Sequence, residues 1–428
     1  MKIGIIGLGY VGLPLCIQFA KSGAEVVGID VDDAKVQSIN RGESFIKHIA
    51  AGDIASLVKA GRLQATTDMA AASTCDGILI CVPTPLNRNR EPDLSYVFST
   101  GEKLAPHVQK GMTIVLESTT YPGTTDEDLR EILEKRSGLK AGIDFHLAYS
   151  PEREDPGNPD SQVAKIPKVV GGYTKACLAK ARELYGIAIK TTVPVSSCRT
   201  AEAVKLLENI FRSVNIALVN ELKIIYEKMD IDVWEVIEAA KTKPFGYTPF
   251  YPGPGLGGHC IPIDPFYLSW KSRQYGVTTR FIELAGEINT SMPEYVVGRT
   301  IESLNSKRKA LNGSRILILG LAYKGEVDDD RESPSYRLID MFKDKMAEVE
   351  YYDPHVPMIR PSREHAHLAG QESVEWNQET ISSFDVVVVS TAHKAVNYEE
   401  LGEWAQSLVD TRNVMAGVEG CVGKIVRA

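Results

Sequence analysis

The residues best suited to covalent chemistry lie in a glycine-rich segment past the middle of the chain. Residues 251–264 read YPGPGLGGHCIPID and contain one cysteine, Cys260, with His259 before it and Asp264 four residues after it. Glycines let the backbone approach a ligand closely, and a loop thiol becomes a nucleophilic thiolate when a positive group lies nearby. Taken alone, Cys260 is compatible with either a catalytic thiolate or a small buried apolar side chain.

A second segment has the spacing of a dinucleotide site. GLGYVG at residues 7–12 follows an apolar run and precedes a helical pattern, and Asp30 ends the next apolar run 18 residues beyond Gly12. The pattern predicts a tight turn that brings backbone and a helix N-terminus to a pyrophosphate. The contacts we expect for this cofactor come from Gly7, Gly9, Tyr10, Val11, Gly12 and Asp30.

The carboxylate of Asp30 favours NAD over NADP, because it accepts both ribose hydroxyls and repels an added phosphate. Lys35 is either a second cofactor contact that neutralises ligand charge or a solvated surface lysine. The alternative for the whole segment is a strand–turn–helix whose glycines serve only packing.

Short apolar runs alternate with helical patterns in the first part of the chain, which predicts a parallel sheet covered by helices. The expected strands are 3–6, 26–29, 77–82, 113–116, 146–149 and 168–171, and helices are expected at 13–22 and 33–40. Residues 201–229 lack Gly and Pro and carry apolar residues at helical spacing. They predict a helix of about 43 Å, long enough to connect domains or to pack against its copy in a dimer.

A second α/β pattern follows. Strands are expected at 315–319, 349–352, 385–390 and 408–410, with a helix at 335–343. We therefore predict three domains: a Rossmann-like NAD-binding domain at 1–199, a long-helix dimerisation domain with the cysteine loop at 200–305, and a Rossmann-like α/β domain at 306–428.

Bulk composition narrows the function class. The net charge of -8 argues against a nucleic-acid partner, and no run approaches the roughly 20 apolar residues that span a bilayer. Seven scattered cysteines fit reduced thiols in a cytoplasmic protein, and the eight histidines show no metal-ligand grouping. We expect a cytoplasmic globular enzyme with no metal and no membrane partner.

The chain resembles the UDP-glucose/GDP-mannose dehydrogenase family over nearly its whole length, and its UDP-N-acetylglucosamine 6-dehydrogenase branch in particular. Separated motifs carry the resemblance: GLGYVG at 7–12, VPTP at 82–85, STTYPGTT at 118–125, SPER at 150–153, AEAVKLLENIFRSVNIALVNE at 201–221, GPGLGGHCIPIDPFY at 253–267 and LAYKGEVDDDRESP at 321–334. Ile263 stands where many UDP-glucose members have lysine, and His259 precedes the cysteine, as in the N-acetylhexosamine branch.

The resemblance implies a four-electron oxidation of a UDP-sugar at C6, with two NAD molecules used in succession. Cys260 would capture the intermediate aldehyde as a thiohemiacetal, which is oxidised to a thioester and hydrolysed. Lys205 and Asn209, four apart on the long helix, would stabilise the oxyanion. Asp264 would assist proton transfer, either directly or by ordering Lys205 and water, and Glu152 would work with Thr119 on the hydrolytic water. The immediate base in each step stays open.

Other contacts follow from the same resemblance. Thr84, Thr119 and Arg331 are predicted cofactor contacts, and an ion pair with a neighbouring aspartate is the alternative for Arg331. His259 either lowers the pKa of Cys260 or contacts an N-acetyl group. The predicted substrate contacts are Glu152, Lys205, Asn209, Tyr251, Gly257, His259, Arg280, Lys324 and Arg412.

The predicted substrate is UDP-N-acetylglucosamine, and UDP-glucose and UDP-N-acetylmannosamine are alternatives within the same chemistry. Two rival classes are a nucleotide-binding protein without catalysis and a two-electron alcohol dehydrogenase that needs no cysteine. A homodimer or larger homo-oligomer is expected from the resemblance, as is a place in the supply of uronic-acid sugars for polysaccharide.

Overall fold

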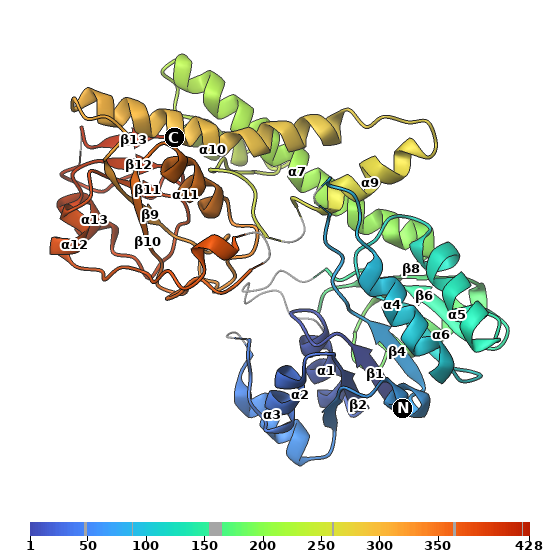
Figure 1. Cartoon of the computed structure of the whole chain (residues 1–428). Helices are drawn as coiled ribbons and strands as arrows, with labels where there is room; N and C mark the ends of the chain where they lie inside the picture. The colour runs from blue at the N-terminus through green and yellow to red at the C-terminus, as the bar shows by residue number, and fades with distance from the viewer. Residues whose placement is uncertain (47–48, 88, 154–164, 259–260, 363–364, 422) are drawn as a thin grey trace. The chain divides into compact units, whose positions relative to one another are not determined.

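The computed structural model describes residues 1–46, 49–87, 89–153, 165–258, 261–362, 365–421 and 423–428. The chain forms two compact bodies, Met1–Asn209 with Phe266–Thr278, and Ile210–Pro265 with Thr279–Ala428 (Figure 1). The boundaries at 199 and 305 that we expect for three domains remain a prediction.

The first body contains an eight-stranded sheet in the order β3-β2-β1-β4-β5-β6-β7-β8. Its strands are β1 Lys2–Ile6, β2 Glu25–Ile29, β3 Leu63–Thr66, β4 Gly77–Ile80, β5 Thr113–Leu116, β6 His146–Tyr149, β7 Lys168–Gly172 and β8 Thr192–Val195. Neighbouring strands run parallel, except that β6 and β7 are antiparallel. The six strands predicted from continuous apolar runs are present, and β3 and β8 were not predicted.

Helices cover both faces of this sheet. β4 and β5 are buried at every residue, and successive strand residues point to opposite faces, so neither face is open to water. The helices are α1 Gly12–Lys21, α2 Asp33–Asn40, α3 Ala51–Lys59, α4 Ser95–Leu104, α5 Arg130–Ser137 and α6 Lys175–Tyr185; 3₁₀ turns lie at η1 Met69–Thr74 and η2 Ala105–His107, and a π-helical turn at η3 Thr124–Leu129. One core cluster joins side chains of α1, α2, α3 and α6 to β1 and β2.

The second body contains a parallel five-stranded sheet in the order β10-β9-β11-β12-β13. Its elements are β9 Arg315–Leu319, α11 Pro334–Asp344, β10 Glu348–Tyr352, η4 Ala366–Leu368, α12 Gln378–Ser382, β11 Val386–Val389, α13 Tyr398–Trp404, β12 Leu408–Asp410 and β13 Ile425–Arg427. The predicted fold class is confirmed: Rossmann-like α/β regions stand at both ends of the chain, with a helical region between them.

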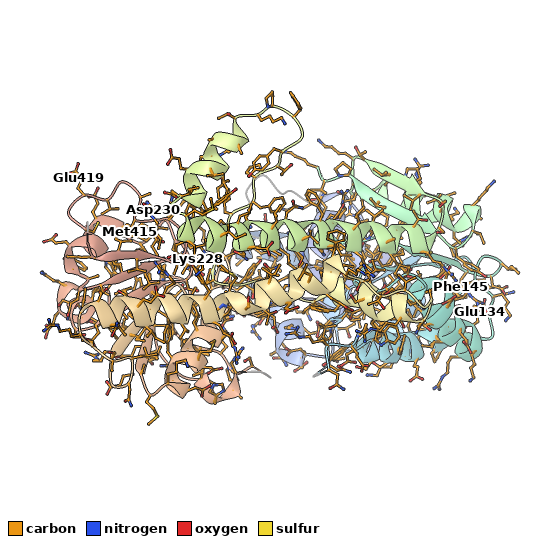
Figure 2. All side chains as sticks on the ribbon, turned by 90° about the horizontal axis from the view of Figure 1, so that it is seen from above. Glu134, Phe145, Lys228, Asp230, Met415 and Glu419 are labelled. Carbon is orange, nitrogen blue, oxygen red and sulfur yellow. The ribbon has the colours of Figure 1, made fainter. Side chains whose placement is uncertain are left out.

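The helical region is built on the predicted long helix, α7 Cys198–Lys228, followed by α8 Val233–Lys241, α9 Asp264–Arg273 and α10 Phe281–Ser306. In the second body, α7 and α10 lie side by side, with Lys228 at the end of α7 (Figure 2). Two buried amides connect them: Asn220 Nδ2 donates to Asn289 Oδ1 at 2.9 Å, and Asn289 Nδ2 donates to the Ser213 carbonyl at 3.0 Å. Buried amides need such partners, so they fix the register of the two helices.

Candidate functional site

The turn at residues 7–12 has the geometry of a dinucleotide loop. Gly7 has φ +93°, and a Cβ at Gly12 would lie 1.8 Å from the Gly7 carbonyl oxygen, so both positions require glycine. A Cβ at Gly9 would meet no atom of the described residues within 4 Å. Packing against these residues therefore does not require glycine here, and the position leaves space above the turn for a ligand.

Asp30 is fixed at the end of β2 by the same turn. Its carboxylate accepts the Leu8 N–H at 2.7 Å and the Asp32 N–H at 2.9 Å, and Lys35 Nζ lies 3.9 Å away. Tyr10 is half-buried, and Val11 caps α1 without a side-chain hydrogen bond. The first turn of α1 thus has no side-chain cap of its own, and the residues present fit a dinucleotide with its pyrophosphate at this helix end.

Two loops at the carboxyl ends of β4 and β5 contact each other. Ser118 Oγ donates to the Val82 carbonyl at 2.7 Å, which connects the STTYPGTT loop to the VPTP loop. The Thr84 carbonyl accepts a hydrogen bond from Tyr267 at 2.9 Å, so the backbone at this predicted cofactor contact is fixed. Thr119, next to Ser118, is half-buried.

A buried glutamate that the sequence analysis missed holds the second half of this loop. Glu202 of α7 accepts hydrogen bonds from the N–H groups of Gly123 at 2.8 Å and Thr125 at 2.9 Å, and from Thr125 Oγ1 at 2.7 Å. Burial raises the pKa of Glu202 to about 7, against the opposing effect of these hydrogen bonds. Its carboxyl therefore fixes the loop that carries Thr119 to the helix that carries Lys205.

The predicted polar face of α7 meets the SPER segment after β6. Lys205 Nζ donates to the Glu152 carbonyl oxygen at 2.6 Å, and Asn209 lies one turn further along α7. Lys205 is 6% exposed and Asn209 is fully buried. An ammonium and an amide of this kind, withdrawn from water, can stabilise a developing oxyanion. The first body thus brings together Glu152 and Lys205, with Asn209 on the same buried helix.

The nucleophile loop is described in part. The predicted Cys260 and His259 lie outside the described residues, whereas the glycines before them pack closely within the second body. A Cβ at Gly257 would lie 2.7 Å from Tyr323 Cβ, and the Gly258 N–H donates to the Arg331 carbonyl at 3.2 Å. The loop therefore lies against the LAYKGEVDDDRESP segment, and only glycines permit so close an approach. Asp264, the first residue of α9, is buried.

Arg412 and Tyr251 are positioned by the second body. Arg412 Nε donates to the Ser390 carbonyl at 2.8 Å, and its guanidinium would lie 2.4 Å from a Cβ at Gly253. Burial lowers the pKa of Arg412 to about 10. Tyr251 stacks on Trp234 with centroids 5.5 Å apart and donates to Glu238 at 2.5 Å.

The remaining predicted contacts are more open. Arg331 forms a bidentate pair with Asp329 at 2.7 and 2.5 Å, which is the alternative named above. Lys324 is half-buried, and Arg280 is exposed at the start of α10. The cofactor contact predicted for Arg331 and the substrate contacts predicted for Lys324 and Arg280 therefore remain predictions.

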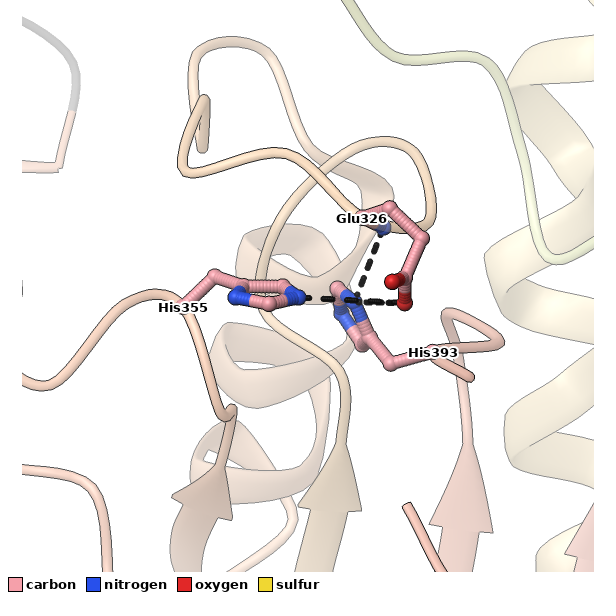
Figure 3. Close-up of side chains that lie close together, drawn as sticks. All are labelled: Glu326, His355 and His393. Carbon is pink, nitrogen blue, oxygen red and sulfur yellow. Dashed lines mark hydrogen bonds and ion pairs between the residues drawn. The ribbon is translucent and has the colours of Figure 1, made fainter. Parts of the chain in front are cut away.

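One group among the described residues has the composition of a metal site, namely Glu326, His355 and His393 (Figure 3). Both ring nitrogens of His393 are already used: Nδ1 accepts the Glu326 N–H at 3.2 Å, and Nε2 pairs with the buried Asp353 carboxylate at 3.1 Å. His355 Nε2 lies 3.7 Å from Glu326 Oε1. The group connects the loops after β9, β10 and β11, and we interpret it as a structural network.

Comparison with known proteins identifies the class that this fold and site define. The chain belongs to the UDP-glucose/GDP-mannose dehydrogenase family: the family's NAD binding domain matches residues 1–189, its central domain residues 199–291, and its UDP binding domain residues 317–417. The predicted family and the NAD cofactor are confirmed, and the protein is a nucleotide-sugar dehydrogenase. Among the described residues, no helix is both long enough and apolar enough to cross a bilayer.

Individual relatives divide between two sugars. The chain is 35% identical to a UDP-N-acetyl-D-mannosamine dehydrogenase of Pyrococcus horikoshii, over 100% of this chain and 98% of the relative. It is 33% identical to a UDP-N-acetyl-D-glucosamine 6-dehydrogenase of Pseudomonas aeruginosa, over 97% of each. A solved structure of the UDP-D-ManNAc dehydrogenase from Pyrococcus horikoshii superposes with a TM-score of 0.89 at 32% identity, covering 100% of this chain and 99% of that one.

Proposed function

We propose that this protein oxidises C6 of a UDP-linked N-acetylhexosamine to a carboxylate through a covalent intermediate on Cys260. In the overall reaction one primary alcohol, two NAD and one water give one carboxylate, two NADH and three protons. Bound NAD would accept one hydride from C6 in each of the two oxidations. The sulfur would hold the sugar between them, so that the aldehyde is not lost while the cofactor is exchanged.

The observation that carries this proposal is the buried polar face of α7. Lys205, donating to the Glu152 carbonyl at 2.6 Å, and the fully buried Asn209 stand one helical turn apart. Such donors can stabilise the alkoxide and the tetrahedral oxyanions, each contributing about 2–4 kcal/mol. A protein that only binds nucleotides has no use for an ammonium and an amide withdrawn from water at this point.

Hydrolysis needs a group that orients water on the thioester. Glu152 and Thr119 follow the carboxyl ends of neighbouring parallel strands, β6 and β5, where α/β sheets bind ligands. We assign the hydrolytic water to this pair. Asp264 is assigned to proton transfer at Cys260, because it is a buried carboxylate four residues from the nucleophile in the sequence.

For the sugar, we propose UDP-N-acetylglucosamine, with UDP-N-acetylmannosamine as second candidate. Ile263 in place of lysine after the nucleophile supports an N-acetylhexosamine over glucose. The relatives' names support both N-acetyl sugars, which differ only in the configuration at C2.

The test is steady-state kinetics with NAD and, separately, UDP-N-acetylglucosamine, UDP-N-acetylmannosamine and UDP-glucose. We expect two NADH per sugar consumed and the highest kcat/KM with UDP-N-acetylglucosamine. Cys260→Ala should form no acid, whereas Cys177→Ala, a buried cysteine of α6, should keep the stoichiometry. One NADH per sugar, or acid formed by Cys260→Ala, would contradict the covalent route.

We also propose that α7 packs against a second copy of the chain. Phe211, Leu218 and Ile225 are exposed along α7 at intervals of seven residues, which is the repeat of a helix–helix seam. Phe211→Glu with Leu218→Glu should lower the mass measured by light scattering to that of one chain. Ile143→Glu, at a still more exposed apolar residue away from α7, should leave the mass unchanged.

A further inference from the structure

A buried lysine lies between two glutamates at the edge of the first sheet. Lys168 Nζ donates to Glu117 Oε2 at 2.5 Å and lies 3.6 Å from Glu152 Oε2. It also donates to the Pro151 carbonyl at 3.4 Å. Side-chain exposure is 7% for Lys168, 0% for Glu117 and 15% for Glu152, so these charges interact with little screening by water.

The antiparallel direction of β7 places Lys168 at the same sheet edge as the two glutamates. Glu117 directly follows β5, and Glu152 follows β6 by a few residues, so both carboxylates stand at the carboxyl edge of parallel strands. β7 is antiparallel to β6, and its first residue, Lys168, therefore lies at that same edge. In an all-parallel sheet the start of β7 would stand at the opposite edge.

The Glu117 carboxylate is held by a second residue at the oxygen that does not contact Lys168. Lys168 therefore bridges the carboxylates of Glu117 and Glu152. The Tyr185 hydroxyl at the end of α6 donates to Glu117 Oε1. Burial raises the pKa of Glu117, and Lys168 opposes that effect. Burial lowers the pKa of Lys168, but attraction to Glu117 and Glu152 more than offsets it, so its pKa lies above the ordinary value. The lysine stays charged, which keeps it attached to both glutamates.

Two ammonium groups thus hold one short segment by different atoms. Lys205 binds the Glu152 backbone carbonyl at 2.6 Å, whereas Lys168 faces the Glu152 carboxylate and the Pro151 carbonyl. The backbone contact leaves the side-chain torsions of Glu152 undetermined. Lys168 at Oε2, together with the Arg153 N–H that donates to Oε1 at 2.6 Å, restricts them, and placement of a catalytic carboxylate to within about 1 Å is worth up to about 100-fold in rate.

We propose that Lys168, anchored by Glu117 and Tyr185, is a positioning residue that orients the Glu152 carboxylate for hydrolysis of the thioester. The inference rests on the proposed function, in which Glu152 orients water. Water adds its oxygen to the acyl carbon, the carbon–sulfur bond breaks, and the protons lost from water leave on the thiol and to solvent. Lys168 touches neither water nor acyl group and acts through Glu152 alone.

The experiment compares single-turnover with steady-state kinetics of the full-length enzyme. Lys168→Met leaves Glu117 buried without its partner, which endangers folding, so the main variant is Glu117→Gln with Lys168→Met. This double change removes both buried charges at nearly constant volume, and such replacements are commonly tolerated. Lys180→Met, which removes an exposed ion pair with Glu183, is the matched control.

In the double variant we expect steady-state kcat to fall by about 10- to 100-fold and KM for the UDP-sugar to fall with it, because the thioester accumulates, whereas kcat/KM and the initial burst of NADH stay unchanged. Mass spectrometry of the reacting enzyme should show the sugar accumulating on Cys260. Lys168→Arg, which can still bridge two carboxylates, should keep most of the activity, and Lys180→Met all of it.

Two results would overturn the inference: wild-type kcat in the double variant, or an equal loss of burst and steady state without any accumulated adduct. The latter would mean that the cluster only supports the fold. If the wild-type enzyme itself gives no NADH with any of the three UDP-sugars, the proposed function fails, and the role of Lys168 fails with it.

Discussion

Glu202 offers a direct test of how a buried carboxyl balances desolvation against hydrogen bonding. It is fully buried and accepts hydrogen bonds from Gly123 N, Thr125 N and Thr125 Oγ1. In Glu202→Gln one oxygen becomes an NH₂ group. If that group faces Gly123, a buried N–H loses its acceptor, which costs about 1–3 kcal/mol of stability at every pH. Glu183→Gln, at an exposed carboxylate of the same body, is the control.

The pH dependence gives the sharper result. Burial raises the pKa of Glu202 to about 7 from the ordinary 4.5, so the folded chain binds this proton more tightly than the unfolded chain. The resulting stabilisation is complete below about pH 4.5 and is lost as pH rises through about 7; at 1.36 kcal/mol per pKa unit it amounts to about 3 kcal/mol. Because Gln does not titrate, the stability of Glu202→Gln relative to wild type should rise by about this amount between pH 5 and pH 8.

Denaturant unfolding of wild type and Glu202→Gln at several pH values measures the difference between their stabilities. Other titrating groups contribute equally to both proteins and cancel in this difference. A difference that is constant with pH would refute the reasoning. A difference of opposite slope would mean that the donors around the carboxylate outweigh its burial and hold the group ionised.

Further predictions concern the cofactor turn and a buried lysine. Gly9→Ala should unfold like wild type but bind NAD more weakly in calorimetry, whereas Gly12→Ala should lose stability, since its Cβ would lie 1.8 Å from the Gly7 carbonyl oxygen. Equal stability of the two variants would contradict this. Asp30→Ala should raise the Kd for NAD about 10- to 100-fold, and a preference of wild type for NADP would oppose our interpretation of this residue. Burial lowers the pKa of Lys223 to about 7, and its ammonium has no hydrogen-bond partner among the residues that the structure describes. That group therefore costs stability as pH falls from about 10.5 through about 7, and Lys223→Met should raise the melting temperature at pH 7 but not at pH 10.

The strands missed by the sequence analysis share a physical cause. β3, β8 and β13 are edge strands, and each lacks a fully buried run. β8 has no buried residue and contains Pro194. Continuous apolar runs mark strands covered on both faces, as in β4 and β5. β3, β8 and β13 have no such run, because residues of each are exposed to water, whereas β10, which is also an edge strand, was predicted at 349–352. The central sheet could thus be predicted, and its width could not.

The candidate site likewise contains residues that could be predicted from the sequence and residues that could not. The turn at residues 7–12, Asp30 and the pair Lys205 and Asn209 could be predicted, because local spacing alone places them on one turn or one helix face. Glu202 could not, since its partners lie about 80 residues earlier in the chain. Its one signal was an acidic residue in a predicted helix, which also describes many solvated residues.

Lys168 shows why some site residues could be predicted from the sequence and others could not. The sequence predicted a strand at 168–171 but not its direction, and a strand's direction decides which end of the sheet receives its first residue. With β7 parallel to β6, a lysine at its start would lie far from the carboxyl edge and would be a plain surface charge. With β7 antiparallel, the same residue is buried between Glu117 and Glu152. Burying a lysine is unfavourable unless it is paired, so a sequence that retains this charge inside a sheet edge needs it there for orientation or for registry. The kinetics of the double variant separate the two, because registry would affect every step and orientation of Glu152 only the last.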